Sequence, residues 1–177
     1  MGMSDKIERK NTSGRIATIA IMTAVTMVFT YVVRIPIAPT RGYINLGDVA
    51  VFFTAFTFGP FSALISGGLG PAIADIAAGY SQWAPITFAA HGLQGFAAAL
   101  VIRALGKSRF GEPLAGLAGM IVMVGLYLLG GAFMVGFGAA VTEVPMNILQ
   151  NAVGIVGGFV LSQAVRKAYP PVKRLAW

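Results

Sequence analysis

Residues 48–79 read DVAVFFTAFTFGPFSALISGGLGPAIADIAAG, and this stretch decides how many times the chain crosses a membrane. It holds 32 residues, and its only charged side chains are Asp48 and Asp75. A membrane-spanning helix needs about 20 apolar residues, so the stretch is too long for one crossing. Gly59-Pro60 interrupts it, and such a pair is typical of a turn between two helices. We therefore predict a helical hairpin with arms of about 11 and 19 residues, the first only about 17 Å long.

The composition places the chain in a lipid bilayer. Its 177 residues are 56% hydrophobic and only 11% charged, whereas soluble domains carry about 25% charged residues. The mean hydropathy is +0.78. The sequence contains no Cys, which excludes disulfides and thiolate metal sites. The net charge of +7 could suggest nucleic-acid binding, but the basic residues cluster at the ends of the chain and in one loop. That distribution is typical of a membrane protein.

Four further apolar runs surround the hairpin, at 16–33, 84–105, 113–138 and 141–165. The first is longer than the apolar region of a signal peptide, so we expect a retained helix. Residues 36–46 are rich in Pro and Gly and are expected to form a loop. The predicted organisation is a single membrane domain with polar tails at 1–14 and 167–177 and a six-helix bundle at 15–166.

The positive charges predict which loops face the cytoplasm. The segment ending at Arg15, the 103–109 loop with Arg103, Lys107 and Arg109, and the C-terminal tail hold eleven of the thirteen Lys and Arg residues. Basic loops lie on the cytoplasmic side. An even number of crossings must then separate the N-terminus from Arg103, so the 48–79 hairpin crosses twice. We predict an all-α integral membrane protein with six transmembrane helices, both termini cytoplasmic and a short second helix; a re-entrant hairpin is the alternative.

A polar ladder marks the last apolar run. Glu143, Asn147 and Asn151 are spaced four residues apart and share one face of a helix. Polar side chains at membrane depth are costly and usually face a cavity, a ligand or another helix. In the predicted topology the ladder lies in the outer half of the membrane, where His91 and Gln94 of the fourth helix also lie. These residues predict a pocket that opens to the outside.

Several residues near this pocket allow two interpretations. Thr142 is a plausible N-cap of the last helix, and Glu143 is then either a ligand contact or a residue that favours the helix N-terminus. His91 contacts either the ligand or a neighbouring helix. We expect Asp75 to fix the outer end of the third helix and Tyr127 to face the core or lipid. Trp83 is expected to belong to the interfacial aromatic belt, with stacking in the pocket as the less favoured alternative.

The sequence offers no enzymatic or energy-coupling motif. It contains no phosphate-binding loop, no Gly-x-Ser-x-Gly motif and no cluster with metal-ligand spacing, so we expect no catalysis, no metal and no cofactor. Asp75 or Glu143 could instead carry protons in a stand-alone proton-coupled carrier. An intramembrane scaffold protein is a third possibility.

Residues 15–165 resemble the substrate-binding S components of energy-coupling factor (ECF) vitamin transporters, in particular the riboflavin-transporter-like group. The resemblance rests on the order and spacing of several motifs: GYINLGD at 42–48, FGP at 58–60, GGLG at 67–70, AD at 74–75, APITF at 84–88, HGLQG at 91–95, EVPMN at 143–147 and QNAVG at 150–154. The family often has Lys-Gly where this chain has His91-Gly92.

The resemblance implies a subunit in a prokaryotic cell membrane that captures a vitamin or its precursor on the outer side. It implies as partners a membrane coupling subunit (the T component) and two cytoplasmic ATPases. It further implies that the loaded subunit topples in the membrane to release its substrate inside. Small residues four apart on the first helix would face the coupling subunit, and the loop after that helix would close over the pocket. Carried over to this sequence, the partner contacts are Ala20 and Ala24, and the substrate contacts are Tyr43, Asn45, His91, Gln94, Glu143, Asn147 and Asn151.

The amides of the ladder suit a neutral heteroaromatic ring with donor and acceptor edges. Riboflavin comes first because of the family group, followed by a hydroxymethylpyrimidine- or pyridoxine-like compound.

Overall fold

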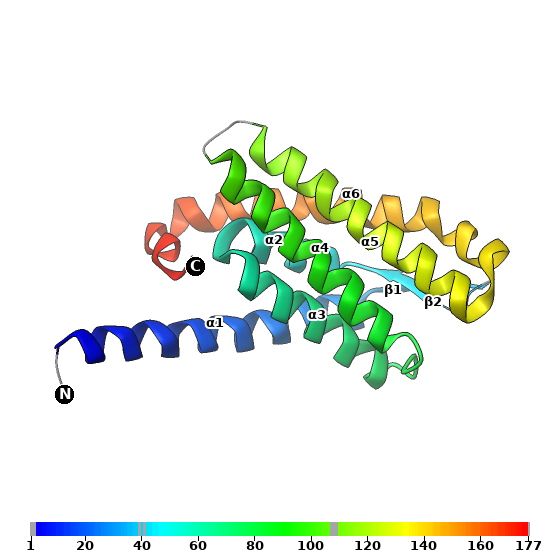
Figure 1. Ribbon diagram of the computed structural model, residues 1–177, viewed down its shortest axis with the longest axis horizontal. Coiled ribbons are helices and arrows are strands. Elements are labelled where there is room, and N and C mark those ends of the chain that lie inside the picture. The colour runs from blue at the N-terminus through cyan, green and yellow to red at the C-terminus, as the bar shows by residue number, and fades with distance from the viewer. Residues whose placement is uncertain (1–2, 39, 41, 107–109, 177) are drawn as a thin grey trace.

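The computed structural model describes residues 3–38, 40, 42–106 and 110–176. Lys107 and Arg109, which entered the predicted topology, lie outside the described residues. The described residues form six α-helices, a two-stranded sheet and a C-terminal 3-10 helix (Figure 1). In chain order these are α1 Met3–Val32, β1 Arg34–Ile37, β2 Gly42–Asn45, α2 Gly47–Phe58, α3 Pro60–Ala77, α4 Ala84–Leu105, α5 Gly111–Val135, α6 Phe137–Ala168 and η1 Pro170–Leu175.

The predicted break at Gly59-Pro60 is confirmed. Gly59 has a φ of 96°, in the region that favours glycine, and Pro60 is the first residue of α3, where its missing N–H costs no helical hydrogen bond. Among the described residues, five helices are long and apolar enough to span a membrane, and α2 is too short. Nearly every residue of α2 is buried within the bundle. A helix that short is tolerated at membrane depth because protein, not lipid, surrounds it.

The segment between α1 and α2 is more ordered than the expected loop. β1 and β2 pair antiparallel, with Ile35 opposite Ile44 and Pro36 opposite Tyr43. The prediction of a plain loop over 36–46 is therefore wrong in part. Strands of four residues that contain Pro and Gly carry too little periodicity to be recognised in the sequence.

The turn between the last two helices also differs from its predicted place. α5 ends at Val135 and α6 begins at Phe137, with Gly136 between them at a φ of 90°. The helix therefore runs through 138–141, the interval between the last two apolar runs, where those runs place the turn. Thr142 is not an N-cap: its hydroxyl donates to the carbonyl of Ala139 within α6. Glu143 accordingly lies in the second turn of the helix.

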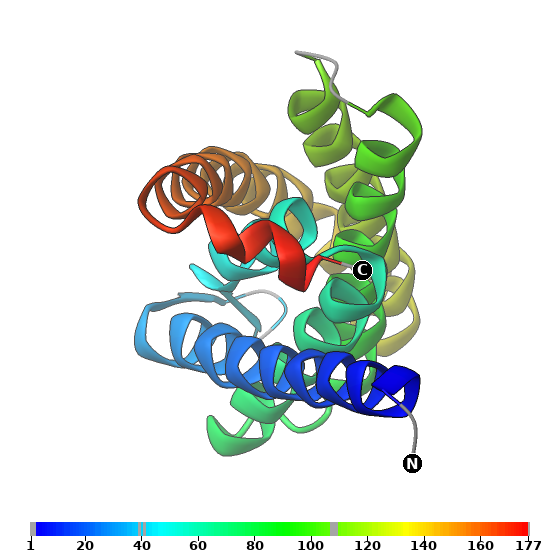
Figure 2. The same ribbon diagram turned by 90° about the vertical axis from the view of Figure 1, so that its left-hand side faces the viewer.

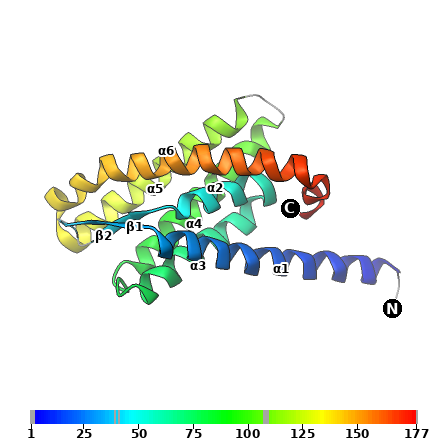
Figure 3. The ribbon, with the colours of Figure 1, turned by 180° about the vertical axis from the view of Figure 1, so that it is seen from behind.

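The bundle is elongated, and its two ends differ. Figures 1 and 3 show both termini at one end of the long axis, and the β hairpin with the α5–α6 turn at the other. Figure 2 shows η1 lying across the first end, where Val172 is buried in a cluster with Met22 of α1 and Phe58 of α2. An even number of crossings would place both termini together in this way.

The contact between α2 and α6 depends on glycine. A Cβ added at Gly158 of α6 would lie 2.7 Å from Cβ of Phe52 and 2.8 Å from the backbone nitrogen of Phe53. We expect Gly158→Val to lower the free energy of unfolding by about 1–3 kcal/mol, because α6 must move away from α2. Thermal unfolding in detergent measures the loss. Gly125→Val on α5 is the matched control, since a Cβ there meets nothing within 4 Å; an equal loss in both variants would contradict the packing argument.

Candidate functional site

A cleft of about 410 Å³, counting its open mouth, lies beneath the β hairpin. Most of this volume is the open mouth: the enclosed interior holds only about 20 Å³, so the cleft is nearly closed in this arrangement. Side chains from six elements converge on it, and most of them are polar or aromatic. The lining residues are Thr30, Gly42, Tyr43, Asn45, Asp75, Trp83, Thr87, His91, Met123, Tyr127, Glu143, Asn147 and Gln150.

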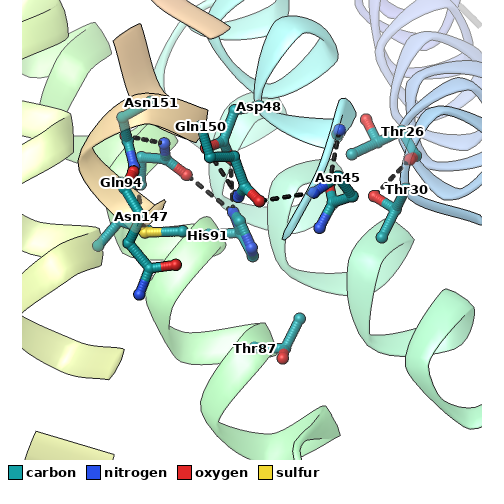
Figure 4. A network of polar contacts seen from close by, with 12 residues as sticks. Thr26, Thr30, Asn45, Asp48, Thr87, His91, Gln94, Asn147, Gln150 and Asn151 are labelled. Carbon is teal, nitrogen blue, oxygen red and sulfur yellow. Dashed lines mark hydrogen bonds and ion pairs between the residues drawn. The ribbon is translucent and has the colours of Figure 1, made fainter. Parts of the chain in front are cut away.

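His91 is held in place by buried polar partners (Figure 4). Its ring nitrogen Nδ1 lies 2.8 Å from Oδ1 of Asp48 on α2 and 2.9 Å from Oε1 of Gln94 on α4. His91, Asp48 and Gln94 are each at most 1% exposed. Both neighbouring oxygens can only accept, so Nδ1 carries the hydrogen in this arrangement. Nε2 is then the ring nitrogen left for a bound molecule.

The polar network continues from His91 on both sides. On one side Gln94 donates to Oδ1 of Asn151 at 2.6 Å, and Asn151 donates to the carbonyl of Asn147 at 2.9 Å. On the other side Gln150 donates to Oδ2 of Asp48 at 3.1 Å. These contacts satisfy several groups that would otherwise be costly to bury at membrane depth.

The β hairpin is tied to the helices below it by three hydrogen bonds. The Tyr43 hydroxyl donates to Oδ1 of Asp75 at 2.5 Å, the Thr40 hydroxyl donates to Oε1 of Glu143, and the Asn45 backbone N–H donates to Oε1 of Gln150 at 2.7 Å. Burial, and after it the negative charge of Asp75, raises the pKa of the Tyr43 phenol above its ordinary value. Its hydroxyl therefore keeps its proton at neutral pH and remains a donor. The side chains that accept these hydrogen bonds, Asp75, Glu143 and Gln150, also line the cleft.

The structure separates the predicted substrate contacts into two groups. Tyr43, Asn45, His91, Glu143 and Asn147 line the cleft. Gln94 and Asn151 are not among the lining residues; both are fully buried behind them and bonded to each other. Figure 4 shows the Asn147 amide turned away from this network.

Helix packing brings further residues to the cleft that the sequence had assigned elsewhere. Trp83 is only 4% exposed and lines the cleft, so it is not a lipid-facing belt residue. Its ring lies 6.3 Å from that of Tyr127, which in turn lies 5.6 Å from His91. Asp75 also lines the cleft. Thr30, Thr87 and Gln150 were not predicted at all, because single polar residues in apolar helices carry no pattern that shows their direction.

Within the described part of the chain, no three His, Asp or Glu side chains come together as a metal site would require. The described residues of the cleft offer hydrogen-bonding groups and aromatic faces.

Comparison with known proteins identifies similar sequences. Residues 10–167 match the family model described as ECF-type riboflavin transporter, S component. The chain is 37% identical over 146 residues to the "Uncharacterized protein in gap 3'region" of Pyrococcus woesei, covering 82% of this chain and 97% of that protein. It is 34% identical over 154 residues to the "Thiamine precursor transporter HmpT" of Lactococcus lactis, covering 86% of this chain and 88% of that protein.

Proposed function

Because this chain belongs to the family of ECF-type riboflavin transporter S components, which are integral membrane proteins, we propose that it binds a vitamin or vitamin precursor in the cleft beneath the β hairpin. The observation that carries the proposal is the cleft itself, which is lined by polar and aromatic side chains at the end of the bundle opposite to both termini. The predicted topology puts that end outside the cell. A nutrient would therefore enter the cleft from the outer side.

The hairpin, the residues that line the cleft and the residues behind the lining have different proposed roles in binding. The hairpin opens to admit the substrate and closes when Tyr43, Thr40 and Asn45 regain their partners on α3 and α6. His91 and Asn147 offer hydrogen-bonding groups to the substrate, and Trp83 and Tyr127 offer ring faces. Gln94 and Asn151 lie behind the residues that line the cleft, where their hydrogen bonds hold His91 and Asn147 in place.

S components work together with a membrane T component and ATPase modules. We propose the same assembly here, with two cytoplasmic ATPases that supply the energy. Ala20 and Ala24 are exposed on α1, on the side away from the buried Met22 and Thr26. Small exposed side chains four residues apart allow close approach of another helix. This face is the proposed contact with the T component, and the loaded subunit then topples to expose the cleft to the cytoplasm.

Two substrate classes are supported by different observations. The family description names riboflavin. The Lactococcus lactis relative is named a transporter of a thiamine precursor, which favours a hydroxymethylpyrimidine-like compound. A pyridoxine-like compound fits the same donors and acceptors.

Ligand binding by the purified protein tests the proposal. We expect one of riboflavin, the aminopyrimidine thiamine precursor and pyridoxine to raise the thermal stability, by about 2.7 kcal/mol at a concentration 100 times its dissociation constant. Yellow colour and flavin fluorescence in the purified protein would identify riboflavin directly. Asn147→Ala should weaken binding of the same compound, because the amide lines the cleft. Failure of all three compounds to stabilise the wild-type protein would reject the proposal.

A stand-alone proton-coupled carrier is the second candidate, because the carboxylates of Asp75 and Glu143 both line the cleft. The two functions differ in their source of energy. A carrier of this kind would accumulate substrate in liposomes under a pH gradient without any partner subunit.

A further inference from the structure

Asp75 occupies an unfavourable position for a carboxylate that only serves the fold. It is 3% exposed and lies in the last turn of α3, which ends at Ala77. The C-terminal end of a helix carries a partial negative charge and disfavours a nearby anion. Burial adds to this cost, because a carboxylate loses its hydration. The end of α3 by itself therefore gives no reason for an acidic residue here.

One of the two carboxylate oxygens has a partner and the other does not. Oδ1 accepts from the Tyr43 hydroxyl at 2.5 Å. Oδ2 is buried, and no group among the described residues forms a hydrogen bond with it. The Thr87 hydroxyl lies near Asp75 and shares a hydrogen bond of 2.7 Å with the Tyr127 hydroxyl, in which either oxygen can be the donor. A buried, unpartnered acceptor that lines a cleft is suited to a donor that arrives with a ligand.

The rest of the cleft favours a ligand that donates hydrogens and carries no negative charge. Its described lining contains two carboxylates, Asp75 and Glu143, and neither Lys nor Arg. The His91 ring is already paired with Asp48. The faces of Trp83 and Tyr127 add an aromatic wall, which attracts planar and cationic groups.

We propose that Asp75 is a substrate-binding residue whose Oδ2 accepts a hydrogen from an amino group or a protonated ring nitrogen of the substrate. The cleft thereby selects an amino-substituted nitrogen heterocycle over its oxo analogue and over a phosphorylated form. Since Tyr43 holds the other oxygen, the same carboxylate joins the substrate to the closed hairpin. This inference rests on the proposed function and narrows its substrate class.

A matched pair of compounds tests the inference. The probes are 4-amino-5-hydroxymethyl-2-methylpyrimidine and its 4-oxo counterpart, titrated calorimetrically into the purified protein. A hydrogen bond to a charged group corresponds to about a 10- to 150-fold change in affinity, so the wild-type protein should prefer the amino compound by a factor in that range. Asp75→Asn should abolish the preference, because its amide can donate to the oxo group instead. Glu112→Gln, a carboxylate-to-amide change outside the cleft, should keep the wild-type ratio.

The outcomes separate this inference from the function on which it rests. Equal affinities in the wild-type protein, or a preference that survives Asp75→Asn, would overturn the role of Asp75. Riboflavin is titrated as a third probe: if it binds while the amino compound does not, the inference fails and the proposed function stands. If no probe binds the wild-type protein, both fail. Should Asp75→Asn not fold, Asp75→Ser replaces it, with the same loss of preference expected.

Discussion

Replacing Ala20 and Ala24 together by tryptophan is expected to abolish substrate uptake by cells that contain the partner subunits, while the purified variant still binds substrate. Both side chains are exposed on α1, so a larger residue meets nothing inside the subunit. Against a closely packed helix of the T component, the added rings would cost about 1–3 kcal/mol each. The two together would weaken assembly by at least tenfold. Uptake of radiolabelled substrate and calorimetric binding measure the two properties separately.

A matched variant distinguishes the α1 face from a general effect of bulk. Ala152 and Ala164 are exposed on α6, and replacing both by tryptophan should leave uptake and binding close to the wild-type values. If the α1 variant loses binding as well, α1 has been assigned the wrong role. Uptake driven by a pH gradient in liposomes that hold this chain alone would exclude the S component function and support a proton-coupled carrier.

Asp48→Asn is expected to cause the largest loss of stability, about 3–5 kcal/mol, and to weaken substrate binding at the same time. Asp48 is fully buried; its Oδ1 lies 2.8 Å from Nδ1 of His91, and its Oδ2 accepts from Gln150 at 3.1 Å. The amide of Asn keeps only one acceptor oxygen and turns an NH2 group toward either His91 or Gln150, so the carboxylate charge is lost and one buried group loses its acceptor. His91 would lose its orientation at the cleft. Titration with a denaturing detergent measures the free energy of unfolding, and calorimetry measures binding.

Glu112→Gln provides the comparison for this loss. Glu112 pairs with Arg166 at 2.9 Å, but both side chains are partly exposed, at 20% and 25%. We expect at most about 1 kcal/mol from this change, because solvent screens exposed pairs, and no change in substrate binding. Similar losses in the two variants would show that the Asp48–His91 contact contributes no more than a surface pair.

The helices were largely predictable because hydropathy and length leave few choices in a membrane. α4 begins and ends at the predicted residues, and the break at Gly59-Pro60 lies where the Gly-Pro pair indicates. The turn at Gly136 was misplaced, because Gly138 nearby offers an equally good turn signal. The hairpin of β1 and β2 was missed, because its pairing depends on contacts between strands and on the helices below them.

The candidate site was predicted only in part. The i, i+4 spacing identified the ladder on α6, and Glu143 and Asn147 do line the cleft. Asn151 shares their helix face but pairs with Gln94 behind the lining. Asp75, expected only to fix the end of α3, lines the cleft. The spacing of residues on one helix face does not show how far the cleft extends along that helix. It also does not show which neighbouring helix packs against each turn.

The sequence by itself determined that this is a membrane protein of helices, with a short second helix and polar side chains gathered toward one end. These properties follow from the free-energy cost of placing polar groups in hydrocarbon. Because of this cost, the membrane-spanning segments are long apolar runs and their few polar residues share a helix face, and both features are visible in the sequence. Only the tertiary structure decided which of those side chains satisfy one another and which remain open to a ligand. That division depends on the rotation and contact of helices far apart in the chain. Through it, Gln94 and Asn151 became each other's partners, and Oδ2 of Asp75 was left unpartnered at the cleft.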